Sequence, residues 1–298
     1  MKLMTIDVGG TEIKYSVMDD ELHMEDEGYV PTPYDSFEQF AQTIYDIYSP
    51  HKDEVEGIAM AIPGFVNFEK GTVSGGGALH YNWNREVAKE LSEKCGCRVV
   101  IENDGKAAAR AEYAKGSLQG CRNAAVFIIG TGVGGGIIVD GHVLRGVHET
   151  AGEYSFMYFD MNDYQGRPDF VGDRCSARGL LGRYTQKTGE EIDGREFFKR
   201  LSEDENAQTS LDEFARDVAV EIINLFWLLD PEKIAIGGGI SRQDILIEKI
   251  KEQFMDTVEK HPFIRNMPVS ELKIVRAQYG NDANQIGAFM AYLEKETQ

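Results

Sequence analysis

Two stretches of this sequence repeat one order of elements: an apolar strand, a glycine-rich turn and a second apolar strand. They are "LMTIDVGGTEIKYSVMD" in residues 3–19 and "AAVFIIGTGVGGGIIVD" in residues 124–140. A repeat of this kind restricts the fold, because each of two equivalent units needs a sheet and a core of its own. We therefore expect two α/β lobes, each built around a mixed sheet.

The segments outside these repeats alternate between strand and helix patterns. We expect strands at 27–32, 55–64, 98–104, 231–241 and 271–278, and helices at 36–49, 84–96, 105–116, 176–189, 211–230, 242–261 and 281–296. Ser36 is the expected N-cap of the first helix, and Gly96 is expected to close the second. Residues 157–173 have no periodicity, which is typical of a functional loop.

Charge and apolar runs exclude some classes of function. The 298 residues carry a formal net charge of −19, which argues against nucleic acid as a partner, because binding it requires Lys and Arg to neutralise phosphates. No apolar run approaches the ~20 residues of a membrane span, and the opening "MKLMTIDVGG" lacks the apolar core of a secretory signal. The four cysteines have no disulfide spacing, so we expect free thiols in the cytoplasm.

Three glycine sites end apolar strands: Gly9-Gly10, residues 130–136 and residues 237–239. One such site alone would favour a hairpin turn, since paired glycines supply the positive φ that short hairpins need. Three sites, two of them in equivalent places of a repeat, instead indicate backbone N–H groups that approach an anion with no Cβ in the way. None matches the P-loop pattern, and the middle site opens no helix, so neither a P-loop nor a dinucleotide-binding fold is predicted.

Two such turns suit the β- and γ-phosphates of ATP. Backbone amides and the hydroxyls of Thr11 and Thr131 would be the donors. Asp7 would lie beside Mg²⁺ and bind it through water, because Mg²⁺ dehydrates reluctantly. The glycine sites therefore predict a nucleotide-binding protein.

Six motifs resemble the ROK family of sugar kinases, within the actin/hexokinase/heat-shock ATPase superfamily. They are "DVGGTEIK", "ENDGKAAARAE", "GTGVGGG", "AGE", "IAIGGGIS" and "GNDANQIGA", and they follow the family's order over nearly the whole chain. The resemblance implies a two-lobe actin-like ATPase (ribonuclease H-like) fold with a central cleft. Residues 1–118 would form the N-terminal lobe, completed by the helix at 283–298, and residues 119–282 the C-terminal lobe.

The resemblance also implies ATP-dependent phosphorylation of a hexose, usually at its 6-hydroxyl, with Mg²⁺ held through Asp7. The nucleotide-binding residues that it implies are Asp7, Gly9, Gly10, Thr11, Lys14, Gly130, Thr131, Gly132, Gly134, Gly237, Gly238 and Gly239. Some family members are repressors with an N-terminal DNA-binding segment. This sequence starts directly at its first strand, which disfavours that branch.

Asp104, in "IENDGKAAA", is the expected catalytic base. It would accept the proton of the sugar hydroxyl that attacks the γ-phosphate, since phosphoryl transfer needs mainly positioning and charge stabilisation. The structural alternative is helix capping, because Asp or Asn before an alanine-rich helix is a common N-cap. The two roles are compatible if Asn103 or Asp104 caps the helix while Asp104 faces the substrate.

Further positions match the family's sugar contacts. Glu153 corresponds to the glutamate that holds sugar hydroxyls, although an exposed loop acid is the structural alternative. The other implied sugar contacts are Gly64, Asn103, Asp104, His148 and an asparagine that is either Asn82 or Asn84. Trp83, between those two asparagines, could equally be a core residue.

The sequence departs from the family where many members carry Gly-His and a zinc motif of cysteines. Ser155 and Phe156 stand at the Gly-His positions, the next cysteine is Cys175, and the histidines offer no metal spacing, so no zinc site is expected. The family's second sugar glutamate is missing, with Gly172 or Asp173 nearby. We expect aromatic burial to anchor the loop instead of zinc, through Phe156, Tyr158, Phe159, Tyr164 and Phe170.

These features together predict a cytoplasmic ATP:hexose phosphotransferase, with glucose as the first substrate to test. Zinc-less relatives include β-glucoside kinases and N-acetylmannosamine kinases, which are the alternative substrate classes. A sugar-sensing regulator without turnover is the alternative outside enzymes, because the histidine and cysteines are lost. Neither nucleic acid nor a membrane is an expected partner, and the resemblance is compatible with a homodimer.

Overall fold

The computed structural model describes residues 1–160 and 169–297, and these form two compact units. The first unit contains Met1–Ala114, Arg145–Ala151 and Asp282–Gln298, and the second contains Lys115–Leu144 and Gly152–Asn281. The segment Arg145–Ala151, here named the strap, therefore belongs to the first unit although its sequence lies within the expected C-terminal lobe. The two units are described separately below.

The first unit is built on a five-stranded sheet in the order β3-β2-β1-β4-β7. Its strands are β1 (Lys2–Val8), β2 (Glu12–Asp19), β3 (Met24–Pro31), β4 (Gly57–Ile62) and β7 (Arg98–Asn103). The pairs β1–β2 and β2–β3 are antiparallel, whereas β4 pairs in parallel with both β1 and β7. A small hairpin, β5 (Val66–Asn67) with β6 (Thr72–Val73), follows β4.

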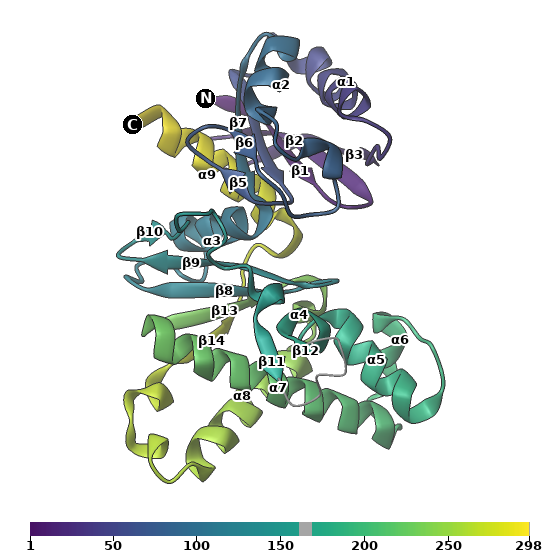
Figure 1. Ribbon diagram of the computed structural model, residues 1–298, viewed down its shortest axis with the longest axis vertical. Coiled ribbons are helices and arrows are strands. Elements are labelled where there is room, and N and C mark those ends of the chain that lie inside the picture. The colour runs from purple at the N-terminus through teal and green to yellow at the C-terminus, as the bar shows by residue number, and fades with distance from the viewer. Residues whose placement is uncertain (161–168, 298) are drawn as a thin grey trace. The chain divides into compact units, whose positions relative to one another are not determined.

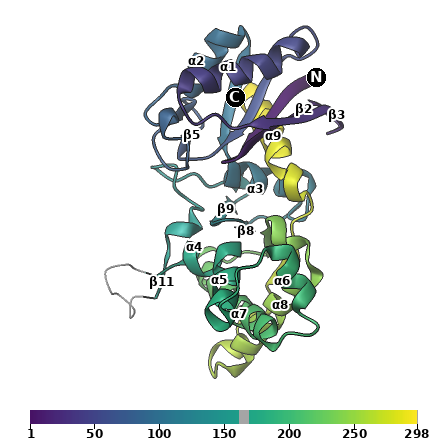
Figure 2. The same cartoon turned by 90° about the vertical axis from the view of Figure 1, so that its right-hand side faces the viewer.

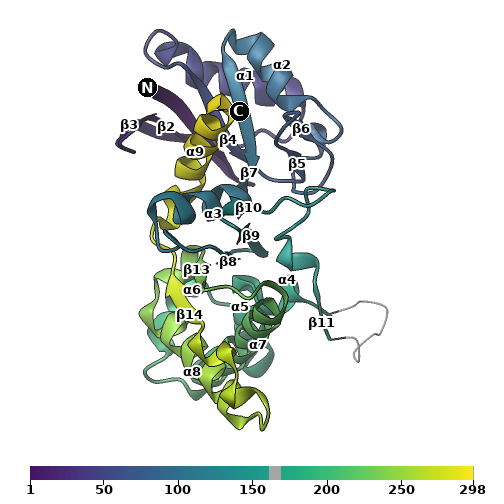
Figure 3. The same ribbon diagram turned by 90° about the vertical axis from the view of Figure 1, so that its left-hand side faces the viewer.

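Helices cover both faces of this sheet. They are α1 (Phe37–Tyr48), α2 (Val87–Cys95), α3 (Asp104–Lys115) and the C-terminal α9 (Ala283–Thr297). Figure 2 shows α1 and α2 in front of the strands, and the opposite view in Figure 3 shows α9 in front. All six residues of β4 are buried, as its continuous apolar run predicts for a strand covered on both faces.

The second unit repeats this topology with a sheet in the order β10-β9-β8-β13-β14 (Figure 1). Its strands are β8 (Ala124–Ile129), β9 (Val133–Val139), β10 (His142–Val143), β13 (Lys233–Gly237) and β14 (Lys273–Arg276). Its helices are α4 (Val171–Arg174), α5 (Ala177–Thr188), α6 (Gly194–Arg200), α7 (Glu205–Leu229) and α8 (Asp244–Lys260). Antiparallel hairpins again precede two parallel pairs, so the internal repeat predicted from the glycine turns is confirmed.

Local sequence signals explain several element ends. The Ser36 side chain accepts a hydrogen bond from the Gln39 N–H as the N-cap of α1, and Gly96 ends α2 with a φ of 71°, as predicted. Sequence reasoning missed α6 and placed the start of α7 too late. The loop expected at 157–173 also contains a short hairpin, β11 (Tyr158–Asp160) with β12 (Asp169–Phe170).

Glu221 is a carboxylate in the core of the second unit. It lies on α7 with 2% of its surface exposed, and its Oε2 has no hydrogen-bond partner among the described residues. Burial, with a smaller contribution from the negative charge of Asp217, raises the pKa of Glu221 to about 7. The folded chain therefore binds this proton more tightly than the unfolded chain does, and folding loses stability as the pH rises from about 4.5 through 7.

We predict that Glu221→Gln stabilises the protein at pH 8 by roughly 2–3 kcal/mol and has little effect at pH 5, because the amide keeps the shape but cannot ionise. Thermal unfolding at both pH values measures the difference. The exposed Glu248 of α8 provides the control, since Glu248→Gln should show no such pH dependence. An equal effect of Glu221→Gln at both pH values would contradict the raised pKa of Glu221.

Candidate active site

The side chain of Asn103 organises the candidate site of the first unit. Its Oδ1 accepts a hydrogen bond from the Lys106 N–H (3.0 Å), so Asn103 caps α3. Its Nδ2 donates to the Gly64 carbonyl (3.0 Å) and to Asp104 Oδ1 (3.1 Å). The structure therefore brings together Gly64, Asn103 and Asp104, three of the predicted sugar-site residues.

Asp104 begins α3, directly after strand β7. Its Oδ1 accepts hydrogen bonds from the Gly105 N–H (2.8 Å) and from Asn103 Nδ2. These two bonds orient the carboxylate through one oxygen and do not use Oδ2. Burial raises the pKa of Asp104, against the opposing effects of the Gly105 N–H and the Lys106 charge. A carboxylate that is oriented and more basic than usual suits proton abstraction.

A second buried carboxylate, Asp7, lies one residue before the end of β1. Burial raises its pKa to about 6, the negative charge of Asp104 adds to this, and a hydrogen bond from Asn284 Nδ2 to Asp7 Oδ1 (2.9 Å) opposes it. Lys14 stands opposite Asp7 in the β1–β2 register and lies 3.6 Å from Glu12. A buried carboxylate whose pKa is raised partly by the charge of a second carboxylate marks a site where a cation is favoured.

The first glycine turn joins β1 to β2 as a hairpin. Neither Gly9 nor Gly10 has a positive φ, so the hairpin conformation does not explain the two glycines. A Cβ on Gly9 would lie 2.9 Å from the Glu12 carbonyl, whereas a Cβ on Gly10 would meet only ordinary contacts at 3.6 Å. The Gly9 N–H donates to Glu12 (3.0 Å), but those of Gly10 and Thr11 donate to no described residue, as an anion-binding turn requires.

Two residues before Asp104, Glu102 is the centre of a charged network that the sequence did not predict. Glu102 is fully buried and accepts two hydrogen bonds from the Arg145 guanidinium, at 2.9 and 2.7 Å, and one from Arg110 at 3.2 Å. Burial alone would raise the pKa of Glu102, but the bonds from Arg145 and the charge of Arg110 lower it. The Arg145 guanidinium also lies 4.0 Å from the Phe68 ring centre, so this network fixes the start of the strap.

The strap is also held at its other end. Lys106, fully buried on α3, donates from Nζ to the Glu149 carbonyl (2.9 Å). His148, a predicted sugar contact, is exposed on the strap beside Glu149, which has a φ of 61°. The bond from Lys106 therefore links the strap directly to the helix that begins at Asp104.

Asn82 and Asn84, the two alternatives for the predicted sugar-binding asparagine, differ in burial. Asn82 has no exposed surface, and neither its Nδ2 nor its Oδ1 has a hydrogen-bond partner among the described residues. Asn84 is exposed, with a φ of 56°. An unpaired buried amide destabilises a fold by about 1–3 kcal/mol. A ligand that formed hydrogen bonds to Asn82 would recover part of this free energy.

In the second unit, residues 130–132 form the turn of the β8–β9 hairpin. The Gly130 N–H bonds to the Gly132 carbonyl (3.0 Å), and the N–H groups of the exposed Thr131 and the half-buried Gly132 donate to no described residue. Gly134 lies in β9, beyond the turn, and a Cβ there would meet nothing closer than 4.0 Å. Gly135 has a packing role, since a Cβ would lie 2.3 Å from the Tyr154 ring.

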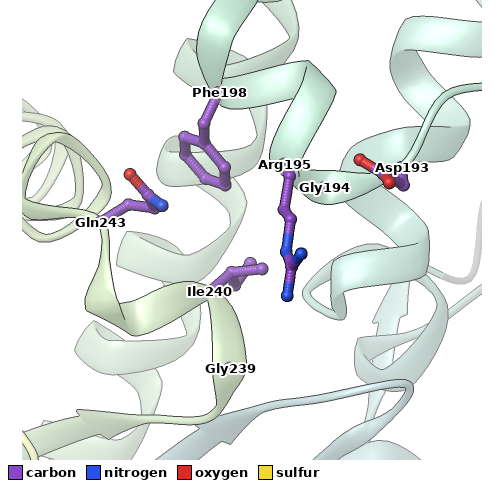
Figure 4. Close-up of a pocket in the computed structure, with 7 residues that line it drawn as sticks. All are labelled: Asp193, Gly194, Arg195, Phe198, Gly239, Ile240 and Gln243. Atoms are coloured by element: carbon purple, nitrogen blue, oxygen red, sulfur yellow. The ribbon is translucent and has the colours of Figure 1, made fainter.

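The third glycine site, Gly237–Gly239, ends β13 next to this turn. Gly238 has a φ of 92°, and a Cβ on it would lie 2.2 Å from the Ile129 carbonyl, whereas nothing lies within 4 Å of a Cβ on Gly239. Gly239 borders a cavity of about 350 Å³. Figure 4 shows its other lining residues, which come from α6 and the turn before α8: Asp193, Gly194, Arg195, Phe198, Ile240 and Gln243.

Glu153 precedes a turn that packs against β9. The next residue, Tyr154, is 2% exposed and stacks on Phe127 with ring centres 5.4 Å apart. The Ser155 Oγ accepts a hydrogen bond from the Val133 N–H (2.7 Å). These contacts fix the backbone that carries Glu153 to the hairpin of the second glycine turn.

The prediction that buried aromatic side chains anchor the following loop is wrong for two of its residues. Phe156 is 61% exposed and Tyr158 is 56% exposed, whereas the buried ring of this segment is Tyr154. Phe159 does pack against the core, and Tyr158 contacts Phe170 with ring centres 5.0 Å apart. Tyr164 lies outside the described residues.

Neither residue near the expected position of the second sugar glutamate replaces it with a free carboxylate: Gly172 has no room for a side chain, and Asp173 pairs with an arginine. A Cβ on Gly172 would lie 2.8 Å from Ser155 Oγ, and Asp173 forms an exposed ion pair with Arg178 (3.1 Å). Within residues 1–160 and 169–297, one group of three potential metal ligands comes together, Asp26, His51 and Glu54 on the first unit. Sequence spacing gave no sign of this group, because it joins a strand to a distant turn.

Comparison with known proteins decides the family. Residues 3–295 match the model of the ROK family. The chain belongs to this family. A β-glucoside kinase from Listeria monocytogenes is 28% identical over 303 residues, which cover 99% of each chain.

Solved structures agree with this assignment. A ROK family protein from Streptococcus pneumoniae in complex with sucrose has a TM-score of 0.87 at 28% identity, over 100% of each chain. A ROK family glucokinase from Streptomyces griseus, in complex with glucose and AMPPNP, has a TM-score of 0.83 at 25% identity, over 99% of this chain and 100% of that one. The two-lobe actin-like fold is thereby confirmed, and the chain is an enzyme of the sugar-kinase class. The central cleft and the lobe boundaries stay predictions.

The four cysteines are unpaired in the structure. In the part of the chain that the structure describes, no helix has both the length and the hydropathy needed to cross a bilayer.

We predict that Gly10→Val and Gly134→Val each weaken ATP binding about tenfold or more, because a branched side chain would obstruct charge-assisted bonds to phosphate. Both sites have room for a Cβ within the chain, so both variants should fold. Titration calorimetry measures the affinity, and Gly182→Val, at an open position on α5, is the matched control. Unchanged affinity in both folded variants would refute the role of the glycine turns.

Proposed function

We propose that this kinase transfers the γ-phosphate of ATP to a hexose hydroxyl, the 6-hydroxyl of glucose or a related hexose, with Asp104 as the base. The observation that carries the proposal is the geometry around Asp104, whose carboxylate is oriented by Asn103 and Gly105 and has a raised pKa. The proton of the attacking hydroxyl passes to Asp104 as the new O–P bond forms and the bond to the ADP oxygen breaks.

The residues present fit ATP and Mg²⁺. The N–H groups of Gly10 and Thr11 in one turn, and of Thr131 and Gly132 in the other, are donors without a described partner, as phosphate oxygens require. The cavity beside Gly239 has the size of a small-ligand pocket and suits the nucleoside. Asp7 would hold Mg²⁺ through water, and the ion would supply charge to the phosphates.

Each unit carries residues that we propose as sugar contacts. Gly64, Asn82, Asn103 and Asp104 belong to the first unit, and Asn82 offers a buried amide that lacks a partner. Glu153 belongs to the second unit, where Tyr154 fixes its backbone. Carboxylates and amides at fixed positions are the groups that select among hydroxyl patterns, because an unmatched buried polar group is costly.

We predict that Asp104→Asn lowers kcat by roughly 10²–10⁴-fold, the usual contribution of a general base. The fold should persist, because an amide oxygen can still accept the Gly105 N–H. Coupled measurement of ADP release with glucose tests this, and Asp256→Asn on α8 controls for the loss of a surface carboxylate. A rate near that of the wild type would leave Asp104 as a structural residue only.

The two carboxylates also predict a pH dependence. Because the pKa of Asp7 is about 6 and that of Asp104 is raised, kcat/KM should fall as the pH decreases through about 6, where the pair takes up a proton. Asp7→Asn removes one negative charge and should move this midpoint to lower pH. A midpoint near pH 4 in the kcat/KM profile of the wild type would contradict the raised pKa values of Asp7 and Asp104.

The substrate is identified by a screen of ADP release over glucose, N-acetylmannosamine, other N-acetylhexosamines and β-glucosides. Turnover of any of these supports the kinase proposal and ranks the alternatives. Binding of a sugar by calorimetry with no ADP release from any of them would favour the sugar-sensing regulator.

A further inference from the structure

Trp83 is a large aromatic side chain held in a fixed position at the surface of the first unit. It is 39% exposed, and its Nε1 donates to the Gly76 carbonyl (2.6 Å). The His80 ring packs against it, with ring centres 4.3 Å apart. We name these two rings, His80 and Trp83, the aromatic ledge.

The backbone around the ledge is also fixed. The Trp83 N–H donates to the His80 carbonyl (3.1 Å), and the Asn84 N–H donates to Val73 (2.7 Å). Val73 in turn pairs with Arg85 as a β-bridge. The ledge is therefore positioned before any ligand arrives, which lowers the entropy cost of binding to it.

Contacts connect the ledge to the proposed base. Trp83 bonds to Gly76, and a Cβ on Gly76 would lie 3.3 Å from the Gly64 Cα. The Gly64 carbonyl accepts a hydrogen bond from Asn103 Nδ2, and the same Nδ2 donates a second bond to Asp104 Oδ1. The residue before Trp83 is Asn82, the buried amide that has no described partner.

A rigid, exposed tryptophan beside a polar sugar site has a physical use. The C–H face of a sugar ring is apolar, and an aromatic ring offers a large, flat contact area with little rotamer entropy to lose. One hexose bound at Gly64, Asn82 and Asp104 would occupy the polar groups. The aromatic ledge next to them would then contact the group that is attached to this hexose.

We propose that the aromatic ledge is a subsite for a second ring attached to the anomeric oxygen of the phosphorylated hexose. This inference rests on the proposed function and narrows its substrate class to glucosides with a ring as aglycone. A β-glucoside kinase at 28% identity and a ROK neighbour solved with sucrose are consistent with such a subsite. Cellobiose is the probe, with glucose as the single-ring comparison.

The sequence offers a direct spectroscopic test, because Trp83 and Trp227 are its two tryptophans. Trp227 is 51% exposed near the end of α7 in the second unit. In Trp227→Phe, the emission of Trp83 alone can be followed without ATP. Cellobiose should change this emission to saturation, and glucose should change it much less. Saturable cellobiose binding by calorimetry with no change in emission would overturn the proposal.

Kinetics provide the second readout. Trp83→Ala should lower the ratio of kcat/KM for cellobiose to that for glucose by about tenfold, which corresponds to ~1.4 kcal/mol. Trp83→Phe keeps an aromatic face but loses the bond to Gly76, so its ratio should lie between those of the wild type and the alanine variant. The matched control is Trp227→Ala, which should leave the ratio unchanged.

The outcomes separate the two proposals. If no sugar releases ADP, the proposed function fails. If glucose is phosphorylated but cellobiose neither binds nor reacts, or if both Trp83 variants fold and keep the wild-type ratio, the subsite is overturned while the kinase proposal stands.

Discussion

One side-chain amide, that of Asn103, sets the geometry on which the first unit's site depends. An asparagine has two donors and two acceptor positions, and here it uses them to cap α3, hold the Gly64 carbonyl and orient Asp104. The strand, the loop after the neighbouring strand and the helix that starts at Asp104 are therefore fixed to one another by a single buried residue. The residue that caps α3 is therefore also the residue that orients Asp104, the proposed base.

Much of the fold could be predicted because its signals are local. The strand–turn–strand repeat predicted two sheets, and both sheets have the same strand order. Asn103 and Asp104 could be recognised because a helix cap and an acid stand next to each other in sequence. The glycine turns were found, but Gly134 lies in a strand and Gly135 is required by Tyr154, since sequence does not say which glycine faces solvent.

What could not be predicted depends on distant contacts. Arg145 pairs with Glu102 across 43 residues, and no local sequence pattern around either residue predicts this pairing. Tyr154 is buried and Phe156 is exposed, and Ser155 fills the space where a side chain on Gly172 would lie, so the tertiary packing of this segment decides both outcomes. The sequence predicts only that aromatic burial, in place of zinc, anchors that loop, and it does not say which of the rings are buried.

The C-terminal helix α9 packs on the sheet of the first unit, although it lies at the other end of the sequence from β1 and β2. Asn284 bonds to Asp7 across 277 residues, and Gln285 bonds to Thr5 and Ser16 in the core of the β1–β2 hairpin. Contacts of such sequence separation raise the contact order, and folding slows because the entropy of a long loop is lost before its contacts form. During synthesis, the amino-terminal hairpin would leave the ribosome long before its partner helix exists. The second unit, by contrast, has its whole sequence available before α9 is made.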